Sequence, residues 1–455
     1  MSWSYLEDAS GAKGHADKIC VPANEADLIA ILESAAREQA PITIAGGGSG
    51  LTGGRVPNGG WLISMEKFRR LEIHEGSATA GAGVTLHSLQ AAARATGQFY
   101  PPDPTETMAF LGGTVAANSS GSRSFKYGAT RQWIQRLRVA LVDGRILDVR
   151  RGDAIDFDVP NIPQPAAKKH SAGYPLRPGM DWIDLFTGSE GTLGIVLEAE
   201  VQLLPNPKEL LNGIIFFPSD EAALDALDQW RAVPNIRMLE YVDDPALRMI
   251  EQRYPDVPKP ARAALIMEQI VEREGDIDAW SARLEETGAM ETESWFGSSD
   301  FDRERFRKFR HALPETALAL AQRNGFPSLG TDFSVPVEKN REMFAFYREH
   351  MDRIMPGHYC IFGHVGDSHP HVNMLPATQE EFDAGTEALM IFAKKAASLG
   401  GSVAAEHGLG KRKAKFLALQ YTPEQIESMK AVKRRLDPDW RLGRGTLFEQ
   451  NGVRP

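Results

Sequence analysis

The spacing of apolar and polar residues predicts short strands and amphipathic helices from the start of the chain. Residues 28–35 carry apolar side chains at positions i, i+3, i+4 and i+7, the pattern of one helix face, and Asn24 can cap that helix. A β-branched run follows at residues 42–44, and a second helix begins after Thr85 and stops at Gly97. We therefore expect a strand-helix-strand unit that presents the segment after residue 44 at the edge of a small sheet.

Strand-like runs are frequent in the middle of the chain. Residues 134–149 form a predicted hairpin whose strands meet at Asp143 and Gly144, a pair typical of tight turns. Beyond Pro205, short apolar strands alternate with amphipathic helices, one of which begins after Ser219. We expect these strands at residues 214–217, 239–242 and 264–270. The pattern predicts an α+β protein whose second part is an α/β domain with an antiparallel sheet.

A glycine-rich segment lies between two of the predicted strands. Residues 45–54 read AGGGSGLTGG, and the next apolar run begins at Trp61. Successive backbone N–H groups in such a turn form an anion-binding nest, which suits the pyrophosphate of a dinucleotide. A flexible Gly/Ser linker is the alternative, although linkers seldom separate two apolar runs so closely. The segment lacks the ending of a P-loop and the helix that follows Rossmann glycines, so another nucleotide-binding fold is expected.

Two further segments are rich in small residues. Residues 110–128 read FLGGTVAANSSGSRSFKYG, and residues 188–194 read GSEGTLG ahead of a predicted strand. Small residues let a backbone run close to a flat ligand, whereas an ordinary surface loop is the other interpretation of residues 110–128. The prolines of residues 100–105, YPPDPT, predict a rigid extended path between the glycine-rich segments.

Composition narrows the classes of function. The 455 residues suffice for two or three domains, and 42% hydrophobic with 25% charged residues is ordinary for a globular protein. The formal net charge of -10 argues against a nucleic-acid binder. The two cysteines, Cys20 and Cys360, are too few for an iron-sulfur cluster or a disulfide framework. Because no signal segment or apolar run of ~18 residues is present, we expect a cytoplasmic protein without a membrane span.

Candidate chemistry is concentrated in the last third of the chain. The segment CIFGHVGDSHPHVN at residues 360–373 places His364, His369 and His371 within eight positions. Neutral imidazole is the commonest metal ligand in proteins, so this spacing indicates a metal site. An odd separation puts His364 and His371 on opposite faces of a continuous strand, but a turn at Gly366 removes this objection. A hydrogen-bonded turn without a metal is the alternative.

The segment GGSVAAEHGLG at residues 400–410 can complete such a site. Glu406 can supply an oxygen ligand while His407, next in sequence, acts as a base. The pattern places this pair between glycines at the end of an apolar strand. A polar pair on the surface is the competing interpretation.

Four of these segments together resemble the FAD-binding domain of the vanillyl-alcohol oxidase family. AGGGSGLTGG, PPDP, GGTVAAN followed by YG, and GSEGTLGIV are most similar to its FAD-linked oxidase branch, which includes D-lactate dehydrogenases, the D subunit of glycolate oxidase and D-2-hydroxyglutarate dehydrogenase. The resemblance implies a two-subdomain PCMH-type FAD-binding domain at residues 1–205. It also implies an α/β substrate-binding cap domain with a metal site at residues 206–430, and a C-terminal segment at residues 431–455 that returns to the FAD domain.

The resemblance further implies which residues hold FAD. The pyrophosphate is expected at residues 46–51, and the adenine half near Glu190, Gly194 and Val196. Relatives with covalent flavin carry a histidine in or near the first glycine-rich segment, where this chain has glycines, so non-covalent FAD is expected. The full set of expected FAD-binding residues is Gly46, Gly47, Gly48, Ser49, Gly50, Leu51, Pro102, Asp103, Gly112, Gly113, Asn118, Glu190, Gly194 and Val196.

The branch carries GHxGDxxxHxN and AEHG motifs, which imply roles for the histidines. In this chain, His364, His371 and Glu406 are then expected to bind a divalent metal such as Zn, Mn or Fe. His407 is the expected general base, and Asn373 the expected contact to the substrate.

Two departures from the branch concern the metal and the substrate. His369 stands where relatives usually have Asn, which leaves a fourth ligand or an altered pocket open. The Arg that clamps the substrate carboxylate in relatives corresponds to Arg310, which can also be interpreted as a solvated residue of a basic helix. Dicarboxylate-using relatives have a Lys just before Asp332, where this chain has Gly330 and Thr331, so a monocarboxylate such as lactate or glycolate is favoured.

The sequence therefore predicts an FAD-dependent dehydrogenase or oxidase. It would convert a small (D-)2-hydroxy acid of the lactate, glycolate or 2-hydroxyglutarate class to the 2-oxo acid, with metal-assisted deprotonation by His407 and hydride transfer to the flavin. Electrons would then pass to an external acceptor, which is a quinone, an electron-transfer flavoprotein or a partner subunit. Peripheral membrane association and a homodimer are left open. The alternatives are an enzyme like alkyl-dihydroxyacetone-phosphate synthase and a flavin subunit of a multi-subunit electron-transfer complex.

Overall fold

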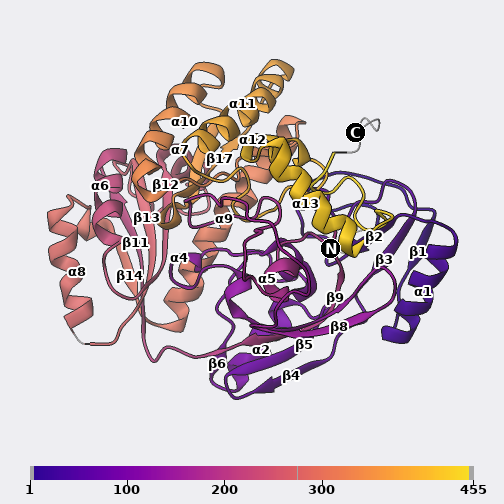
Figure 1. Ribbon diagram of the computed structural model, residues 1–455. Helices are drawn as coiled ribbons and strands as arrows, with labels where there is room; N and C mark the ends of the chain where they lie inside the picture. Colours follow the sequence, from indigo (N-terminus) through magenta and orange to yellow (C-terminus); the bar gives the residue numbers. More distant parts are fainter. Residues whose placement is uncertain (1–4, 274, 450–455) are drawn as a thin grey trace.

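The computed structural model describes residues 5–273 and 275–449, and it divides the strands among four sheets (Figure 1). The sheets of the first half lie apart from the large sheet of the second half, and the last part of the chain, drawn in yellow, lies back toward the first half. Both halves contain helices and strands, which confirms the predicted α+β class. In the described residues, no helix is both long and apolar enough to cross a membrane.

A small parallel sheet carries the first glycine-rich segment. Its strands lie in the order β1 (Lys18–Cys20), β3 (Trp61–Ser64) and β2 (Ile42–Ala45). Helix α1 (Glu25–Arg37) connects β1 to β2, and the side chain of Asn24 caps it by accepting the N–H of Asp27. The predicted strand-helix-strand unit is confirmed, and residues 46–60 leave the sheet at the carboxyl end of β2.

A five-stranded antiparallel sheet lies beside it. The strands follow the order β4 (Leu71–His74), β5 (Ser77–Gly81), β9 (Ile195–Gln202), β7 (Ile134–Ala140) and β8 (Ile146–Arg150). The predicted hairpin is β7 with β8, and Gly144 in its turn has φ 87°, a value that favours glycine. Helix α2 (Leu86–Ala95) begins after its predicted cap Thr85 and packs on this sheet.

Short elements surround the second and third glycine-rich segments. The sequence pattern did not indicate a helix in residues 110–128, but Leu111 and Val115 are buried on one face of a helix that contacts β9. Asn118 ends this helix in the left-handed conformation. The short elements are β6 (Gln98–Phe99), α3 (Leu111–Ala117), α4 (Ser124–Tyr127), η1 (Thr130–Trp133), α5 (Trp182–Phe186) and β10 (Leu204–Pro205).

The second half is built on a seven-stranded sheet. In spatial order its strands are β14 (Trp295–Gly297), β11 (Leu210–Phe217), β13 (Ala263–Ile270), β12 (Ile236–Asp243), β16 (Tyr359–His364), β17 (His369–Met374) and β15 (Leu329–Gly330). Every recorded pairing in this sheet is antiparallel, as predicted. Strands β11, β12 and β13 contain the three runs that the sequence marked as strands.

Alternate side chains of these strands pack against different helices. Ile215 and Leu265 belong to a core shared with α6 (Asp220–Trp230), α8 (Gly275–Glu286), α10 (Asn340–Ile354) and α11 (Gln379–Ser398). Ile214 and Ile266 alternate with them and pack with α7 (Asp244–Met249) and α9 (Asp300–Asn324). The single-turn elements η2 (Glu291–Glu293) and η3 (Val337–Lys339) lie between these helices in sequence. The sheet is therefore covered on both faces, and the face toward α9 carries the polar residues described below.

The chain after α11 returns to the first half. The sequence pattern predicts a strand ahead of Glu406, but residues 403–410 form an irregular loop, because side chains take most of its N–H groups. After η5 (Ala414–Phe416) and α12 (Leu417–Gln420), helix α13 (Pro423–Leu436) begins with a capping box of Thr422 and Gln425. Leu442 then bridges to Ile42 of β2. The domain limits at residues 205 and 430 stay predictions.

Candidate active site

A cavity of about 320 Å³ lies where the glycine-rich segments meet the loop at residues 403–410. Its walls include residues 46–52, 112–114, 119–121 and 189–191 from the first half, and Glu406, His407 and Gly443 from the end of the chain. Glycine is required at some of these positions, since a Cβ on Gly112 would lie 2.7 Å from the Cβ of Ala82. Backbone groups therefore line a space that side chains do not fill, which fits a long dinucleotide cofactor.

Most of the predicted FAD-binding residues line this cavity. They are Gly46, Gly47, Gly48, Ser49, Gly50, Leu51, Gly112, Gly113, Glu190, Gly194 and Val196. Pro102, Asp103 and Asn118 are not among the lining residues. Asp103 instead pairs with Arg123 at 3.4 Å, and Asn118 accepts the backbone N–H of Arg131 at 2.9 Å. Both side chains thus hold protein segments together, and their contact with FAD stays a prediction.

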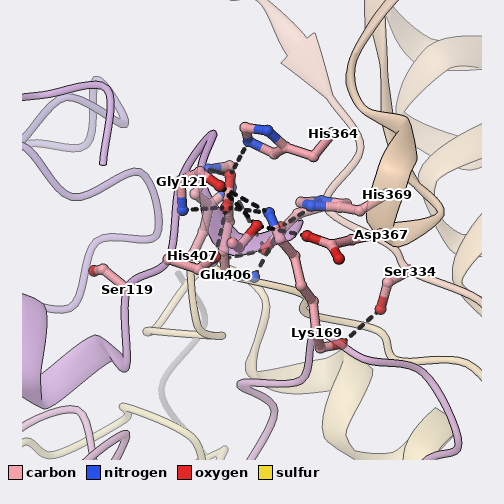
Figure 2. Close-up of polar contacts among 12 residues, drawn as sticks. Ser119, Gly121, Lys169, Ser334, His364, Asp367, His369, Glu406 and His407 are labelled. Atoms are coloured by element: carbon pink, nitrogen blue, oxygen red, sulfur yellow. Dashed lines mark hydrogen bonds and ion pairs between the residues drawn. The ribbon is translucent and has the colours of Figure 1, made fainter. Parts of the chain in front are cut away.

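The three clustered histidines share one face of the seven-stranded sheet. The turn η4 (Val365–Asp367) reverses the chain, so that β16 and β17 pair with His364 opposite His369. Residues paired across an antiparallel ladder point to the same face, and His371 lies two positions further along, so the odd spacing is no obstacle. Figure 2 shows His364 and His369 directed toward Glu406. Ligand atoms of the three histidines and Glu406 all lie within 4.8 Å of one another.

Acceptors outside the cluster fix the orientation of two imidazoles. Nδ1 of His364 donates to Glu240 on β12 at 2.6 Å, and Nδ1 of His371 donates to the carbonyl of Thr331 at 2.8 Å. Because these partners act as acceptors, Nδ1 carries a proton in both rings and Nε2 is the nitrogen available to a metal. The two Nε2 atoms lie 3.2 and 3.6 Å from Oε1 of Glu406.

Glu406 is held by residues that lie far from it in sequence (Figure 2). Its Oε2 accepts hydrogen bonds from Ser120 Oγ at 2.9 Å, Lys169 Nζ at 3.0 Å and the N–H of Gly121 at 3.3 Å. Burial alone raises the pKa of Glu406, but Lys169 and His364 together hold it well below its usual value. The carboxylate is therefore ionised. No local pattern marked Ser120 or Lys169, and the sequence analysis did not identify them.

Asp332 orients His407. Its buried carboxylate accepts the N–H of Glu406 at 3.2 Å and the N–H of His407 at 3.0 Å, and it lies 3.5 Å from Nδ1 of His407. Nε2 of His407 lies 3.6 Å from Oε1 of Glu406, and His407 lines the cavity. Burial lowers the pKa of His407 although Asp332 and Glu406 oppose this shift, so the imidazole is neutral at about pH 7 and can accept a proton.

Two glycine-rich segments of the first half hold the other end of this loop. Glu190 accepts the N–H of Leu409 at 2.8 Å and the N–H of Gly410 at 2.7 Å. The carbonyl of Thr52 accepts the N–H of Lys411 at 3.1 Å. The position of His407 therefore depends on the cavity wall. Glu190, which we expected near the adenine half of FAD, lines the cavity and also anchors this loop.

Arg310 lies beside the cluster, and its guanidinium is engaged. Its Nε and Nη2 donate to Oε2 and Oε1 of Glu240 at 2.5 and 3.1 Å, so Arg310 holds the carboxylate that orients His364. Burial raises the pKa of Glu240, but the charges of Arg310 and His364 outweigh it and keep this pKa well below its usual value. Asn373 donates its amide to the carbonyl of His371 at 3.2 Å. Substrate contacts by Arg310 and Asn373 stay predictions.

Comparison with known protein families gives this site its context. Residues 16–150 match the family described as an FAD binding domain, and residues 206–447 match the family described as the C-terminal domain of FAD linked oxidases. Together with the glycine-lined cavity, these matches define the class as an FAD-dependent oxidoreductase. The second match alone covers more than half of the residues, and the chain belongs to the FAD-linked oxidase family.

Relatives of known name span nearly the whole chain. A glycolate oxidase subunit GlcD from Bacillus subtilis (strain 168) is 31% identical over 453 residues, which are 96% of this chain and 89% of the relative. A D-lactate dehydrogenase from Archaeoglobus fulgidus is 30% identical over 440 residues, 94% of this chain and 90% of the relative. A D-2-hydroxyglutarate dehydrogenase from Xanthomonas citri pv. viticola is 28% identical over 449 residues, 95% and 89% of the two chains. These matches confirm the predicted branch.

Solved structures support the fold. An alkyldihydroxyacetonephosphate synthase matches with a TM-score of 0.64 over 93% of this chain and 75% of that chain. Its sequence identity is 16%, so this likeness concerns the fold alone.

Proposed function

We propose that this chain oxidises a small D-2-hydroxy acid to the 2-oxo acid, with FAD as the hydride acceptor. The main support is the position of Glu406 and His407 on the wall of the glycine-lined cavity, with the histidine cluster beside Glu406. The names of three relatives agree on hydroxy-acid substrates, and two of them specify the D configuration.

FAD fits the glycine-lined cavity. The N–H groups of residues 46–51 would bind its pyrophosphate as a nest does, and the glycines at residues 112, 113 and 194 leave room for flat rings. When bound, FAD accepts a hydride from the carbinol carbon of the substrate. Among the described residues that line the cavity there is no cysteine, and His407 is the only histidine, which supports non-covalent binding.

A divalent metal fits His364, His371 and Glu406. Two imidazoles backed by acceptors and one ionised carboxylate converge there, a donor set that suits Zn, Mn or Fe. A cation in this position would place positive charge beside the substrate hydroxyl and lower its pKa.

His407 acts as the general base in this proposal. Its Nε2 takes the proton of the substrate hydroxyl, while Asp332 beside Nδ1 stabilises the resulting imidazolium. The proton therefore goes to His407 and the hydride to FAD, which accounts for both electrons of the oxidation. Glu190 and Thr52 keep the loop of His407 against the cavity wall during this transfer.

Arg310 and Asn373 are assigned to the substrate's polar end. The described hydrogen bonds to Glu240 use Nε and Nη2 of Arg310, which leaves Nη1 to donate to a carboxylate. Gly330 and Thr331 offer no second cation ahead of Asp332. This arrangement favours a monocarboxylate such as lactate or glycolate.

A second candidate function is that of a flavin subunit within a larger complex, because the Bacillus subtilis relative is named as a subunit. In that case the chain still binds FAD but needs its partner for turnover. The electron acceptor would then be the partner subunit instead of a quinone or an electron-transfer flavoprotein.

Anaerobic bleaching of the flavin absorbance tests the proposal. The purified holoprotein is mixed with D- and L-lactate, glycolate and D- and L-2-hydroxyglutarate, with and without prior chelation. We expect bleaching by one D-acid or by glycolate, and loss of bleaching after chelation with recovery when the metal is restored. No bleaching by any of these acids would reject the single-chain dehydrogenase, and bleaching that survives chelation would reject the metal assignment alone.

A further inference from the structure

We propose that His369 is a fourth metal ligand, so that the site has three imidazoles and one carboxylate and prefers Zn²⁺ or Co²⁺ over Mn²⁺. This inference rests on the proposed metal site at His364, His371 and Glu406. It adds one residue to that site and states which metals the addition favours.

The surroundings of His369 indicate a missing partner. The residue has 0% exposure, and Nδ1 of its ring has no hydrogen-bond partner among the described residues. Buried polar atoms in proteins are nearly always satisfied, so a buried imidazole nitrogen without a protein partner is suited to bind an ion. His364 and His371 differ in this respect, because each already has an acceptor at Nδ1.

The position of His369 matches that of a ligand. It lies directly opposite His364 in the pairing of β16 with β17, and its ring centroid is 5.5 Å from that of His364 and 4.4 Å from that of His371. The potential ligand atoms of all four residues fall within 4.8 Å of one another, so small side-chain rotations suffice to bring them onto one ion.

Asp332 supplies the support that a metal-bound histidine usually has. Its Oδ1 lies 3.1 Å from Nε2 of His369. With Asp332 at Nε2, the nitrogen left for the ion is Nδ1 of His369. Glu240 supports His364 in a similar way, but at Nδ1, and leaves Nε2 for the ion. The competing role for His369 is a purely structural brace of Asp332, and the experiment below separates the two roles.

A third imidazole changes which metal is favoured. Nitrogen donors raise affinity for the later divalent metals, whereas oxygen-rich sites suit Mn²⁺. With one carboxylate and three imidazoles as ligands, the metal preference of the site shifts toward Zn²⁺ and Co²⁺. Removing His369 should therefore shift the preference back toward Mn²⁺.

Cobalt titration of the holoflavoprotein tests this inference. Chelated wild-type protein, with FAD bound, is titrated with Co²⁺ while the visible d–d bands are recorded, and Zn²⁺ and Mn²⁺ then compete for the site. We expect His369→Asn to weaken Co²⁺ and Zn²⁺ binding by about 100-fold and to reduce the Zn²⁺/Mn²⁺ preference by about 10-fold. His350→Asn is the matched control, because His350 is also nearly buried but lies on α10 outside the cluster, and it should leave both quantities unchanged.

A cysteine variant provides a readout that does not depend on the stability of His369→Asn. If residue 369 coordinates the ion, His369→Cys should give a thiolate-to-Co²⁺ charge-transfer band that wild type and His350→Asn lack. An unchanged metal preference in His369→Asn, or the absence of this band in His369→Cys, would overturn the inference. If wild type binds neither Co²⁺ nor Zn²⁺, the proposed metal site itself fails, and with it the role of His369, whereas bleaching of the flavin without any metal would leave the dehydrogenase proposal standing.

Discussion

The glycine-lined cavity and the histidine cluster share the loop at residues 403–410 but are built from different chemical groups. The cavity wall at residues 46–51 presents backbone groups and small side chains to its ligand. The cluster presents imidazoles and a carboxylate, most of which have a second residue behind them, such as Glu240 behind His364 and Lys169 behind Glu406. The comparison teaches that the two regions should fail in different ways. Added volume should damage the cavity, whereas lost charge or orientation should damage the cluster.

Removal of the base should have the largest effect. His407→Ala takes away the proton acceptor at the boundary between the two regions, so the anaerobic rate of flavin reduction should fall by about 10²- to 10⁴-fold. The FAD absorbance of the purified protein should remain, because backbone groups of other segments form most of the cavity wall. Stopped-flow reduction and the flavin content measure the two quantities. Loss of FAD in this variant would show that His407 belongs to the cavity and not to the reaction.

Loss of a charge behind the cluster should have the next largest effect. Glu240→Gln removes the ionised acceptor of His364 and the partner of Arg310, so metal affinity should fall by about 10- to 100-fold while FAD content is unchanged. Calorimetric metal titration measures the change. Glu304→Gln removes an exposed carboxylate of α9 and should have no effect. A fall in FAD content with Glu240→Gln would contradict the separation of the two regions.

Added volume in the cavity wall should lower FAD content and leave metal affinity unchanged, the reverse of the result expected for Glu240→Gln. A Cβ on Gly112 meets Ala82, so Gly112→Ala should lower the free energy of unfolding by about 1–3 kcal/mol. A Cβ on Gly113 meets no protein atom within 4 Å, so Gly113→Ala should fold normally. If FAD occupies the cavity, Gly113→Ala should nevertheless retain less of it. Denaturant unfolding and flavin content distinguish the two variants, and metal affinity should not change in Gly113→Ala.

The smallest effect concerns Glu190, which joins the two regions. Burial raises its pKa to about 7 although hydrogen bonds from Leu409 and Gly410 oppose this shift. Because the native carboxyl holds its proton to a higher pH than the unfolded one, its contribution to stability is complete below about pH 4.5 and is lost as pH rises to about 7. Glu190→Gln should therefore gain stability relative to wild type over this window, as measured by denaturant unfolding of the apoprotein. A pH-independent difference would show that Glu190 is ionised throughout.

Much of the fold could be predicted because its signals are local. Asn24, Thr85 and Ser219 cap helices where the sequence placed caps, and short apolar runs located β11, β12 and β13. The prediction of a strand ahead of Glu406 was wrong, and residues 403–410 form a loop. The pattern of apolar residues does not indicate which side chains accept backbone N–H groups.

The cavity and the cluster also differ in how far the sequence describes them. The glycine-rich segments of the cavity are recognised from their local composition. The spacings within two short motifs likewise mark His364, His371, Glu406 and His407. Glu240, Lys169 and Asp332 were missed because their partners lie far from them in sequence; Glu240 and His364, for example, are 124 residues apart. An isolated acid within the apolar strand RMLEYV was the one local signal for Glu240.

The loop that carries His407 has a consequence for synthesis of the chain. Its contacts with Thr52 join residues about 355 positions apart, and the loop carries Glu406 and His407 of the cavity wall. A ribosome adds roughly 5–20 residues per second. The loop that carries His407 would therefore be synthesised roughly 20 to 70 s after the first glycine-rich segment. During that time the cavity would be open on the side that Glu406 and His407 line. A cofactor could therefore enter the cavity of the nascent chain from this open side until the C-terminal residues fold back.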